Sequence, residues 1–256
     1  MAVEAHEDFK EMELWEHLQE LRVRLIRSVV YVLIGLGAAW VIYPWLQDLF
    51  FRPMRPFLGD NNRLYFDSFM GPFMLQLQVS LVAGLVLAIP GVTLEAWGFI
   101  APGLTRTERK ACYVVFPLSI LFFFLGVACG YALMSVTIGY FMGYLDTSQF
   151  VLLQNPQKYL TFMVKMVVAF GVCFQMPVIL SFLGWIGLVT SDFLKAQWRF
   201  AVVGCFAVAA IATPGGDPMT MIIMAAPLAI LYVTSIYLVG LVEKIRERRE
   251  REEAVL

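Results

Sequence analysis

Six apolar runs, separated by polar or turn-forming segments, constrain this chain more than any other feature. They cover about Ser28–Leu46, Phe73–Trp97, Tyr113–Ile138, Tyr159–Trp185, Phe200–Ala212 and Met219–Val242. A helix needs about 20 apolar residues to cross the hydrocarbon core of a bilayer, and all the runs but one approach or exceed that length. The pattern predicts an all-α integral membrane protein with six transmembrane helices.

The composition also favours a membrane protein over a soluble one. Hydrophobic residues make up 60% of the chain and charged residues 15%, against about 45–50% and about 25% in soluble domains. The run Phe200–Ala212 is short, because its residues rise only about 20 Å in a helix. Either this helix extends back through Trp198 toward Leu194, or the bilayer thins around it.

The distribution of basic residues predicts the orientation. The side that holds both chain ends carries Lys10, Arg22, Arg24, Arg27, Arg106, Arg109, Lys110, Lys195, Arg199, Lys244, Arg246, Arg248, Arg249 and Arg251. The opposite loops carry only Arg52, Arg55, Arg63 and Lys158. Because lysine and arginine are enriched in cytoplasmic loops, we expect both termini in the cytoplasm. The chain is then one membrane domain, with a cytoplasmic lead (1–27), a bundle (28–242) and a charged tail (243–256). We expect this tail to be either a solvated helix end or disordered.

Enzyme and cofactor motifs are missing from the sequence. It contains no GxxxxGK[ST], GxSxG or HExxH pattern and no CxxC pair, and its only histidines, His6 and His17, precede the first run. A membrane-embedded enzyme would therefore lack a nucleophile and base. We expect no catalytic residue, no metal, no cofactor and no nucleic-acid partner.

Polar residues inside apolar runs are costly and often functional. Lys165 lies near the outer end of the fourth run, where it either snorkels to the interface or takes part in function. Gln175 lies deeper, where a glutamine needs hydrogen-bond partners from another helix or from water. The same applies to Gln78 in the second run. "GVACG" (Gly126–Gly130) fits the GxxxG pattern that allows close helix packing.

Two carboxylates interrupt the basic side. Glu20 lies in "HLQELRVRL" before the first run, and Glu108 lies in "FIAPGLTRTERK", where Pro102 and Gly103 predict a turn. Both have structural explanations, because Glu20 can pair with Arg24 across one helical turn and Glu108 suits the positive end of a helix dipole. Together they could also bind a pair of guanidinium groups, since arginine contacts a carboxylate bidentately.

These segments resemble the TatC family, the multispanning receptor of the twin-arginine protein translocase. The resemblance rests on "HLQELRVRL", "WGFIAPGLTRTERK", "FGVCFQMPV" and "TPGGDP", which follow the family's order over about Leu14 to Val242. It implies a six-helix, cup-shaped bundle in the bacterial inner membrane with cytoplasmic termini. It also implies that Glu20 and Glu108, with Arg22 nearby, bind twin-arginine signal peptides. Export would be driven by the proton motive force, in an oligomeric complex with TatA- and TatB-type single-span subunits.

The sequence departs from the family pattern at intramembrane polar positions. Gln175 stands where the family often has glutamate, and Gln78 stands where a lysine or other polar contact is common. Met221 and Val233 occupy positions that are often Gln and Glu. We expect signal recognition to be retained, while the polar track that contacts partner subunits, which includes Lys165, is depleted.

The segment "TPGGDP" separates the last two runs and predicts a tight turn on the outer side. It includes Pro214 and has one more residue than the family's usual form before Asp217. The alternative function is a proton- or ion-coupled secondary transporter of a small solute. That class often has inverted repeats and midplane charges, and we find no repeat in this sequence.

Overall fold

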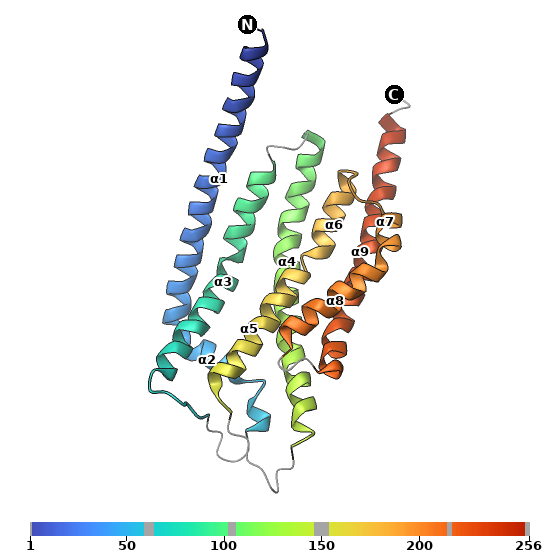
Figure 1. Cartoon of the computed structure of the whole chain (residues 1–256). Coiled ribbons are helices and arrows are strands. Elements are labelled where there is room, and N and C mark those ends of the chain that lie inside the picture. Colours follow the sequence, from blue (N-terminus) through green and yellow to red (C-terminus); the bar gives the residue numbers. More distant parts are fainter. Residues whose placement is uncertain (1, 59–63, 102–105, 146–153, 214–216, 254–256) are drawn as a thin grey trace.

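The protein, described by a computed structural model, is an elongated bundle of helices (Figure 1). The structure describes residues 2–58, 64–101, 106–145, 154–213 and 217–253. Its elements are α1 (Ala2–Val41), α2 (Tyr43–Phe51), the 3-10 turn η1 (Arg55–Phe57), α3 (Gly71–Ile100), α4 (Arg106–Met142), α5 (Pro156–Cys173), α6 (Met176–Trp185), α7 (Ser191–Ala196), α8 (Trp198–Ala212) and α9 (Pro218–Glu253). No strand occurs in these ranges, in agreement with the predicted all-α class.

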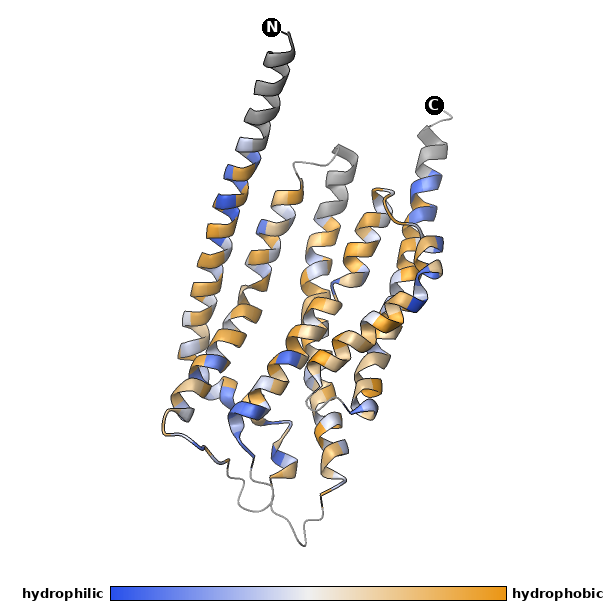
Figure 2. Ribbon diagram, in the orientation of Figure 1, coloured by the Kyte–Doolittle hydropathy of each residue, from blue (hydrophilic) through white to orange (hydrophobic). Residues whose placement is uncertain are grey.

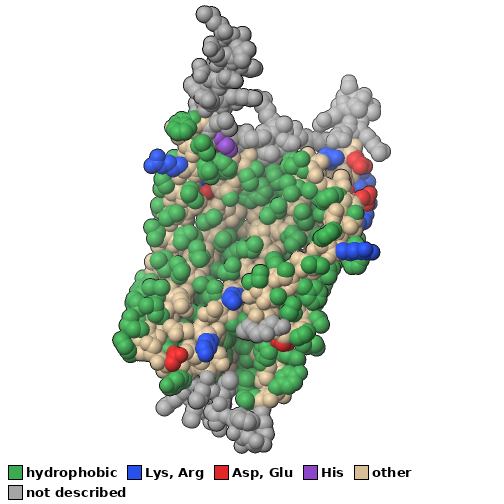
Figure 3. All heavy atoms as spheres, in the orientation of Figure 1, with side chains coloured by type: hydrophobic (Ala, Val, Ile, Leu, Met, Phe, Trp, Pro, Cys, Tyr) green, Lys and Arg blue, Asp and Glu red, His purple; other side chains and the backbone are tan. Residues whose placement is uncertain are grey.

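Five stretches of the described chain are long and apolar enough to cross a bilayer. They are His17–Val41, Gly71–Ile100, Tyr113–Met142, Pro156–Trp185 and Pro218–Arg248. Hydrophobic residues run along these helices, and hydrophilic residues gather toward their ends (Figure 2). Hydrophobic side chains also cover most of the visible outer surface between the two ends (Figure 3). A surface of this kind suits contact with lipid rather than water.

The predicted fifth span corresponds to the shorter helix α8. This helix begins at Trp198, whereas Leu194 belongs to the separate helix α7, so the expected backward extension stops at Trp198. The 15 residues of α8 rise about 22 Å, less than the roughly 30 Å of a bilayer core. A total of six crossing helices therefore stays a prediction.

Prolines set two boundaries that the apolar runs do not reveal. The first run predicts one helix to Leu46, but α1 ends earlier and Leu46 lies in α2. Pro44 explains this break, because proline has no N–H to donate and its ring clashes with the preceding turn. The fourth run is divided in the same way just before Pro177, between α5 and α6. Other prolines lie inside longer helices: Pro90 in α3, Pro117 in α4 and Pro227 in α9.

Glycines allow two helix pairs to pack closely. Antiparallel helices α1 and α3 make the most extensive contact among the described elements. A Cβ atom on Gly84 would lie 2.7 Å from the Cα of Leu36, and one on Gly35 would collide with the carbonyl oxygen of Gly84. In α4, Cβ atoms on Gly126 and Gly130 would likewise crowd the backbone of α5. The close packing predicted for Gly126–Gly130 is therefore confirmed.

Both chain ends project from the same end of the bundle. The start of α1, the end of α3, the start of α4 and the end of α9 all lie there (Figure 1), and we call this end the rim. Helix α9 continues without a break to Glu253, so the predicted tail is helical as far as that residue. The common location of the two ends is consistent with the topology expected from the basic residues.

Candidate functional site

A bridged arginine lies at the rim, between α1 and α3. Arg24 donates from Nε and Nη2 to one oxygen of Glu20, at 2.9 and 2.6 Å. Its Nη1 donates to Glu95 Oε2 at 3.3 Å. The predicted pair of Glu20 and Arg24 is present, and the same guanidinium also contacts a carboxylate 71 residues away. We call Glu20, Arg24 and Glu95 the rim cluster.

Glu95 is the residue of this cluster for which the sequence predicted neither a role nor a partner. It is 8% exposed and lies in the last turns of α3. Burial of a carboxylate is costly unless a cation or hydrogen bonds compensate it, and Arg24 supplies both. A carboxylate within a long apolar run, followed closely by Gly98, is the sequence signal that could have identified it. Gly98 matters because a Cβ there would collide with the Arg24 guanidinium.

An aromatic contact borders the rim cluster. The ring of His17 stacks on Phe99, with centroids 4.4 Å apart and planes 18° apart. His17 Nδ1 also lies 4.0 Å from the second oxygen of Glu20. Arg22, which the family resemblance places near the signal, is exposed on α1, and the rim cluster does not include it.

Several predicted site residues are described only partly or not at all. Glu108 lies in the first turn of α4, at the rim, but its side chain lies outside the described residues. Pro102, Gly103 and Pro214 also lie outside them. The helical position of Glu108 is compatible with both of its proposed roles, as a helix-start carboxylate and as a signal contact.

A polar network crosses the apolar interior below the rim cluster. Gln175, at the break between α5 and α6, donates from Nε2 to the carbonyl oxygen of Ser119 in α4 at 2.9 Å. The indole of Trp97 in α3 donates to the hydroxyl of the same serine at 3.1 Å. Gln175 thus bonds to another helix, as expected from its depth. The network ties three helical segments together, and Trp97 lies only two residues after Glu95.

The other intramembrane polar residues lie apart from this network. Lys165 is exposed on α5, and Gln78 is half-buried in α3. Of the two positions in α9 that depart from the family pattern, Met221 packs against the main hydrophobic core and Val233 is exposed. An exposed lysine near the outer end of an apolar span is compatible either with snorkelling or with contact to a partner.

Asp217 begins the last long helix. The backbone N–H of Thr220 donates to Asp217 Oδ2 at 3.0 Å, and the Thr220 hydroxyl donates to Oδ1. These donors hold the pKa of Asp217 below its usual value, because they stabilise the charged form. The aspartate therefore serves as an N-terminal cap of α9.

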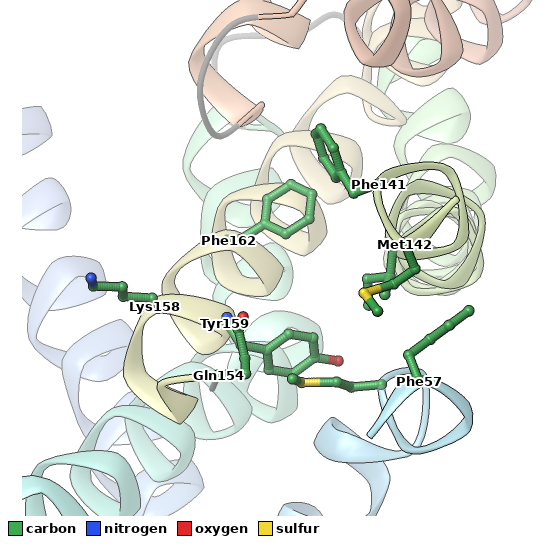
Figure 4. A pocket seen from close by; sticks show the side chains of 9 residues that line it. Phe57, Phe141, Met142, Gln154, Lys158, Tyr159 and Phe162 are labelled. Atoms are coloured by element: carbon green, nitrogen blue, oxygen red, sulfur yellow. The ribbon is translucent and has the colours of Figure 1, made fainter. Parts of the chain in front are cut away.

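A cavity of about 300 Å³ opens at the end of the bundle opposite the rim. Its walls are Met54, Phe57, Ile138, Phe141, Met142, Gln154, Lys158, Tyr159 and Phe162. Figure 4 shows aromatic rings and methionine facing the space, while the amino group of Lys158 points away. The Tyr159 hydroxyl donates to the Phe50 carbonyl at 2.8 Å. The cavity is lined mostly by apolar side chains.

The comparisons with known proteins fit this architecture. The family model of the Sec-independent protein translocase protein TatC matches residues 16–227. The chain belongs to the TatC family. A TatC of Desulforapulum autotrophicum is 37% identical over 241 residues, covering 93% of this chain and 88% of that protein. A chloroplastic TATC of Oryza sativa is 35% identical, covering 91% of this chain and 64% of that protein.

The fold also matches a solved member of the TatC family. A crystal structure of the twin arginine translocase receptor TatC superimposes with a TM-score of 0.78 at 32% identity. The match covers 87% of this chain and 98% of that one. This protein is therefore a membrane component of Tat protein transport. The matched segment includes the rim cluster and the polar network around Gln175.

Proposed function

We propose that this protein is the signal receptor and core subunit of a twin-arginine translocation system. It would bind twin-arginine signal peptides at the rim and nucleate export of folded proteins, driven by the proton motive force. In this proposal the rim faces the cytoplasm of a bacterial inner membrane, and partner subunits of TatA and TatB type complete the complex. The excess of basic residues on the rim side supports this orientation.

The observation that carries the proposal is the rim cluster itself. Glu20 and Glu95 hold a guanidinium group through three nitrogen atoms, at distances of 2.6 to 3.3 Å. The rim therefore contains carboxylates whose spacing suits arginine. Recognition through several nitrogen atoms of one planar guanidinium favours arginine over lysine, which is the discrimination that a twin-arginine receptor needs.

We further propose that Glu108 supplies the second signal-binding carboxylate, with Arg22 close to the bound peptide. Its place in the first turn of α4, at the rim, puts it at the same end of the bundle as Glu20. Contacts with partner subunits would involve Gln175, Gln78 and Lys165. Of these, Lys165 is exposed on α5 and offers a charge that a polar or acidic partner helix could contact.

The test measures the affinity of twin-arginine and twin-lysine signal peptides for purified protein in nanodiscs. Charged hydrogen bonds contribute about 1.5–3 kcal/mol each, so Glu20→Ala and Glu108→Ala should each weaken twin-arginine binding about tenfold or more. Conservative replacement by Asp should retain more affinity than Ala. Glu247, exposed on α9 at the rim end, provides a matched control, and Glu247→Ala should bind like the wild type.

Two results would contradict the proposed function. Equal binding of the two peptides by the wild type would remove the basis for a twin-arginine receptor. Wild-type affinity in both Glu20→Ala and Glu108→Ala would leave these carboxylates as a helix pair and a helix-start charge. A small-solute transporter would show no preference between the peptides.

A further inference from the structure

The guanidinium of Arg24 fills a site that is shaped for it. All three of its nitrogen atoms donate to the two carboxylates of the rim cluster. On the neighbouring turn of α3, Gly98 leaves the space that the guanidinium occupies, since a Cβ there would collide with it. Two carboxylates on different helices, with a glycine against the guanidinium, thus form an arginine site, and the chain's own arginine occupies it.

The site is accessible as well as occupied. The Arg24 side chain is 23% exposed and that of Glu20 is 32% exposed, whereas the Glu95 side chain is 10% exposed. An incoming arginine can therefore reach Glu20 from solvent, but one oxygen of each carboxylate, Glu20 Oε1 and Glu95 Oε2, already accepts hydrogen bonds from Arg24. Since both competitors are guanidinium groups, exchange replaces one set of charged hydrogen bonds with an equivalent set.

We propose that Arg24 is an internal competitor, which occupies the arginine-binding carboxylates until an arginine of the signal peptide displaces it. The inference rests on the proposed receptor function and adds Glu95 to the residues that contact the signal. In this arrangement Arg24 neutralises Glu95 while the receptor is empty. Arg24 also raises the apparent dissociation constant of the signal peptide, because the peptide must displace it. An ammonium group lacks the planar fork of a guanidinium and displaces Arg24 poorly.

The expected effect of removing the competitor follows from the occupied fraction. If the site is free in only about one molecule in ten, the apparent dissociation constant is about tenfold higher than the intrinsic one. Arg24→Gln removes the guanidinium and keeps a polar side chain of similar reach. It should bind a twin-arginine peptide about tenfold more tightly than the wild type. The twin-lysine peptide should also bind with measurably higher affinity, because it no longer has to displace Arg24.

The experiment measures peptide affinity for the full chain in nanodiscs, by fluorescence anisotropy with labelled twin-arginine and twin-lysine peptides. Arg27→Gln is the matched control, since Arg27 is exposed on the same helix and the change in charge is identical. Its affinity should stay within about twofold of the wild type, well short of a tenfold effect. Methylguanidinium provides a second probe and should compete with the peptide at lower concentration in Arg24→Gln than in the wild type.

Three results would overturn the proposal that Arg24 competes with the signal peptide. If Arg24→Gln binds the twin-arginine peptide no more tightly than the wild type, Arg24 only positions Glu20 and does not compete. Should Arg24→Gln fail to fold, Arg24→Lys decides, because it keeps the charge but loses the fork. It should bind the twin-arginine peptide more tightly than the wild type, and unchanged or weaker binding refutes competition. A wild type without preference for twin-arginine over twin-lysine overturns the receptor function and this inference together, whereas preserved preference without tightening overturns this inference alone.

Discussion

Adding one methyl group is expected to have opposite effects at two glycines of the helix pair α1 and α3, Gly84 in α3 and Gly37 in α1. A Cβ on Gly84 would lie 2.7 Å from both the Cα and the N of Leu36, and these are backbone atoms that cannot rotate away. A Cβ on Gly37 would have no atom within 4 Å. Gly84→Ala and Gly37→Ala are therefore chemically identical changes in the same helix pair, one at a crowded site and one in open space.

The magnitudes follow from the geometry. Ordinary carbon contacts lie at about 3.5–4.0 Å, so Gly84→Ala must separate the two helices by roughly 1 Å. Overpacking of this kind costs about 1–3 kcal/mol, which corresponds to a fall in Tm of roughly 2–12 °C at about 2–4 °C per kcal/mol. Gly37→Ala should instead leave Tm unchanged or raise it slightly, because alanine favours a helix by up to about 1 kcal/mol over glycine.

The assay is thermal unfolding in detergent or nanodiscs, combined with peptide binding. Separation of α1 from α3 also moves Arg24 away from Glu95, whose hydrogen bond is already 3.3 Å long. Gly84→Ala should therefore alter signal affinity as well as Tm, whereas Gly37→Ala should alter neither by much. If Gly84→Ala is as stable as Gly37→Ala, the backbones of α1 and α3 do not meet at Gly84, and the packing argument is wrong.

Three further predictions concern other parts of the chain. Gln175→Leu removes a cross-helix hydrogen bond worth about 0.6 kcal/mol, so Tm should fall by about 1–2 °C. Signal binding should survive, while assembly with partner subunits should weaken. Loss of peptide crosslinking with an intact complex would contradict this assignment. In a cysteine-free background, a cysteine at Asp67 should react with an impermeant reagent from outside the cell and one at Lys244 should not; reversed labelling would invert the topology. Asp217→Ala should lower Tm more than Asp217→Asn, which keeps a capping oxygen. Because the folded-state pKa of Asp217 is lowered, its contribution is complete at neutral pH and is lost only as pH falls through that value; equal Tm for both variants would show that the cap is dispensable.

Much of this fold could be predicted from local features of the sequence. Apolar length identified five of the helical spans, and the helical spacing of Glu20 and Arg24 predicted their pair, because both depend only on residues near one another in the chain. The depth of Gln175 likewise predicted a bond to another helix. The sequence did not indicate which atom would accept it, since the position of Ser119 depends on how α4 packs against the break between α5 and α6.

The role of Glu95 could not be predicted in the same way. Its partner Arg24 is 71 residues away, and the two meet only because α1 and α3 pack at a particular rotation and height. That arrangement depends on glycines in the middle of both helices, which composition and periodicity do not distinguish from other small residues. Resemblance to the TatC family indicated Glu20 and Glu108 as site residues. The role of the buried Glu95 follows only from the packing of α1 against α3, which brings it to Arg24.

The contact between α1 and α3 also fixes the rotation of each helix about its own axis. Arg24 and Gly35 lie 11 residues apart on one helix, and Gly84 and Glu95 lie 11 residues apart on its antiparallel partner. Eleven residues make about three full helical turns and span about 16 Å. The glycine contact and the ion pair therefore lie on the same face of each helix. One residue inserted between Arg24 and Gly35 would rotate the guanidinium by about 100° and turn it away from α3, whereas an insertion before His17 would leave both contacts in place. The number of residues in these two intervals is thus under the same constraint as the identity of the side chains at their ends.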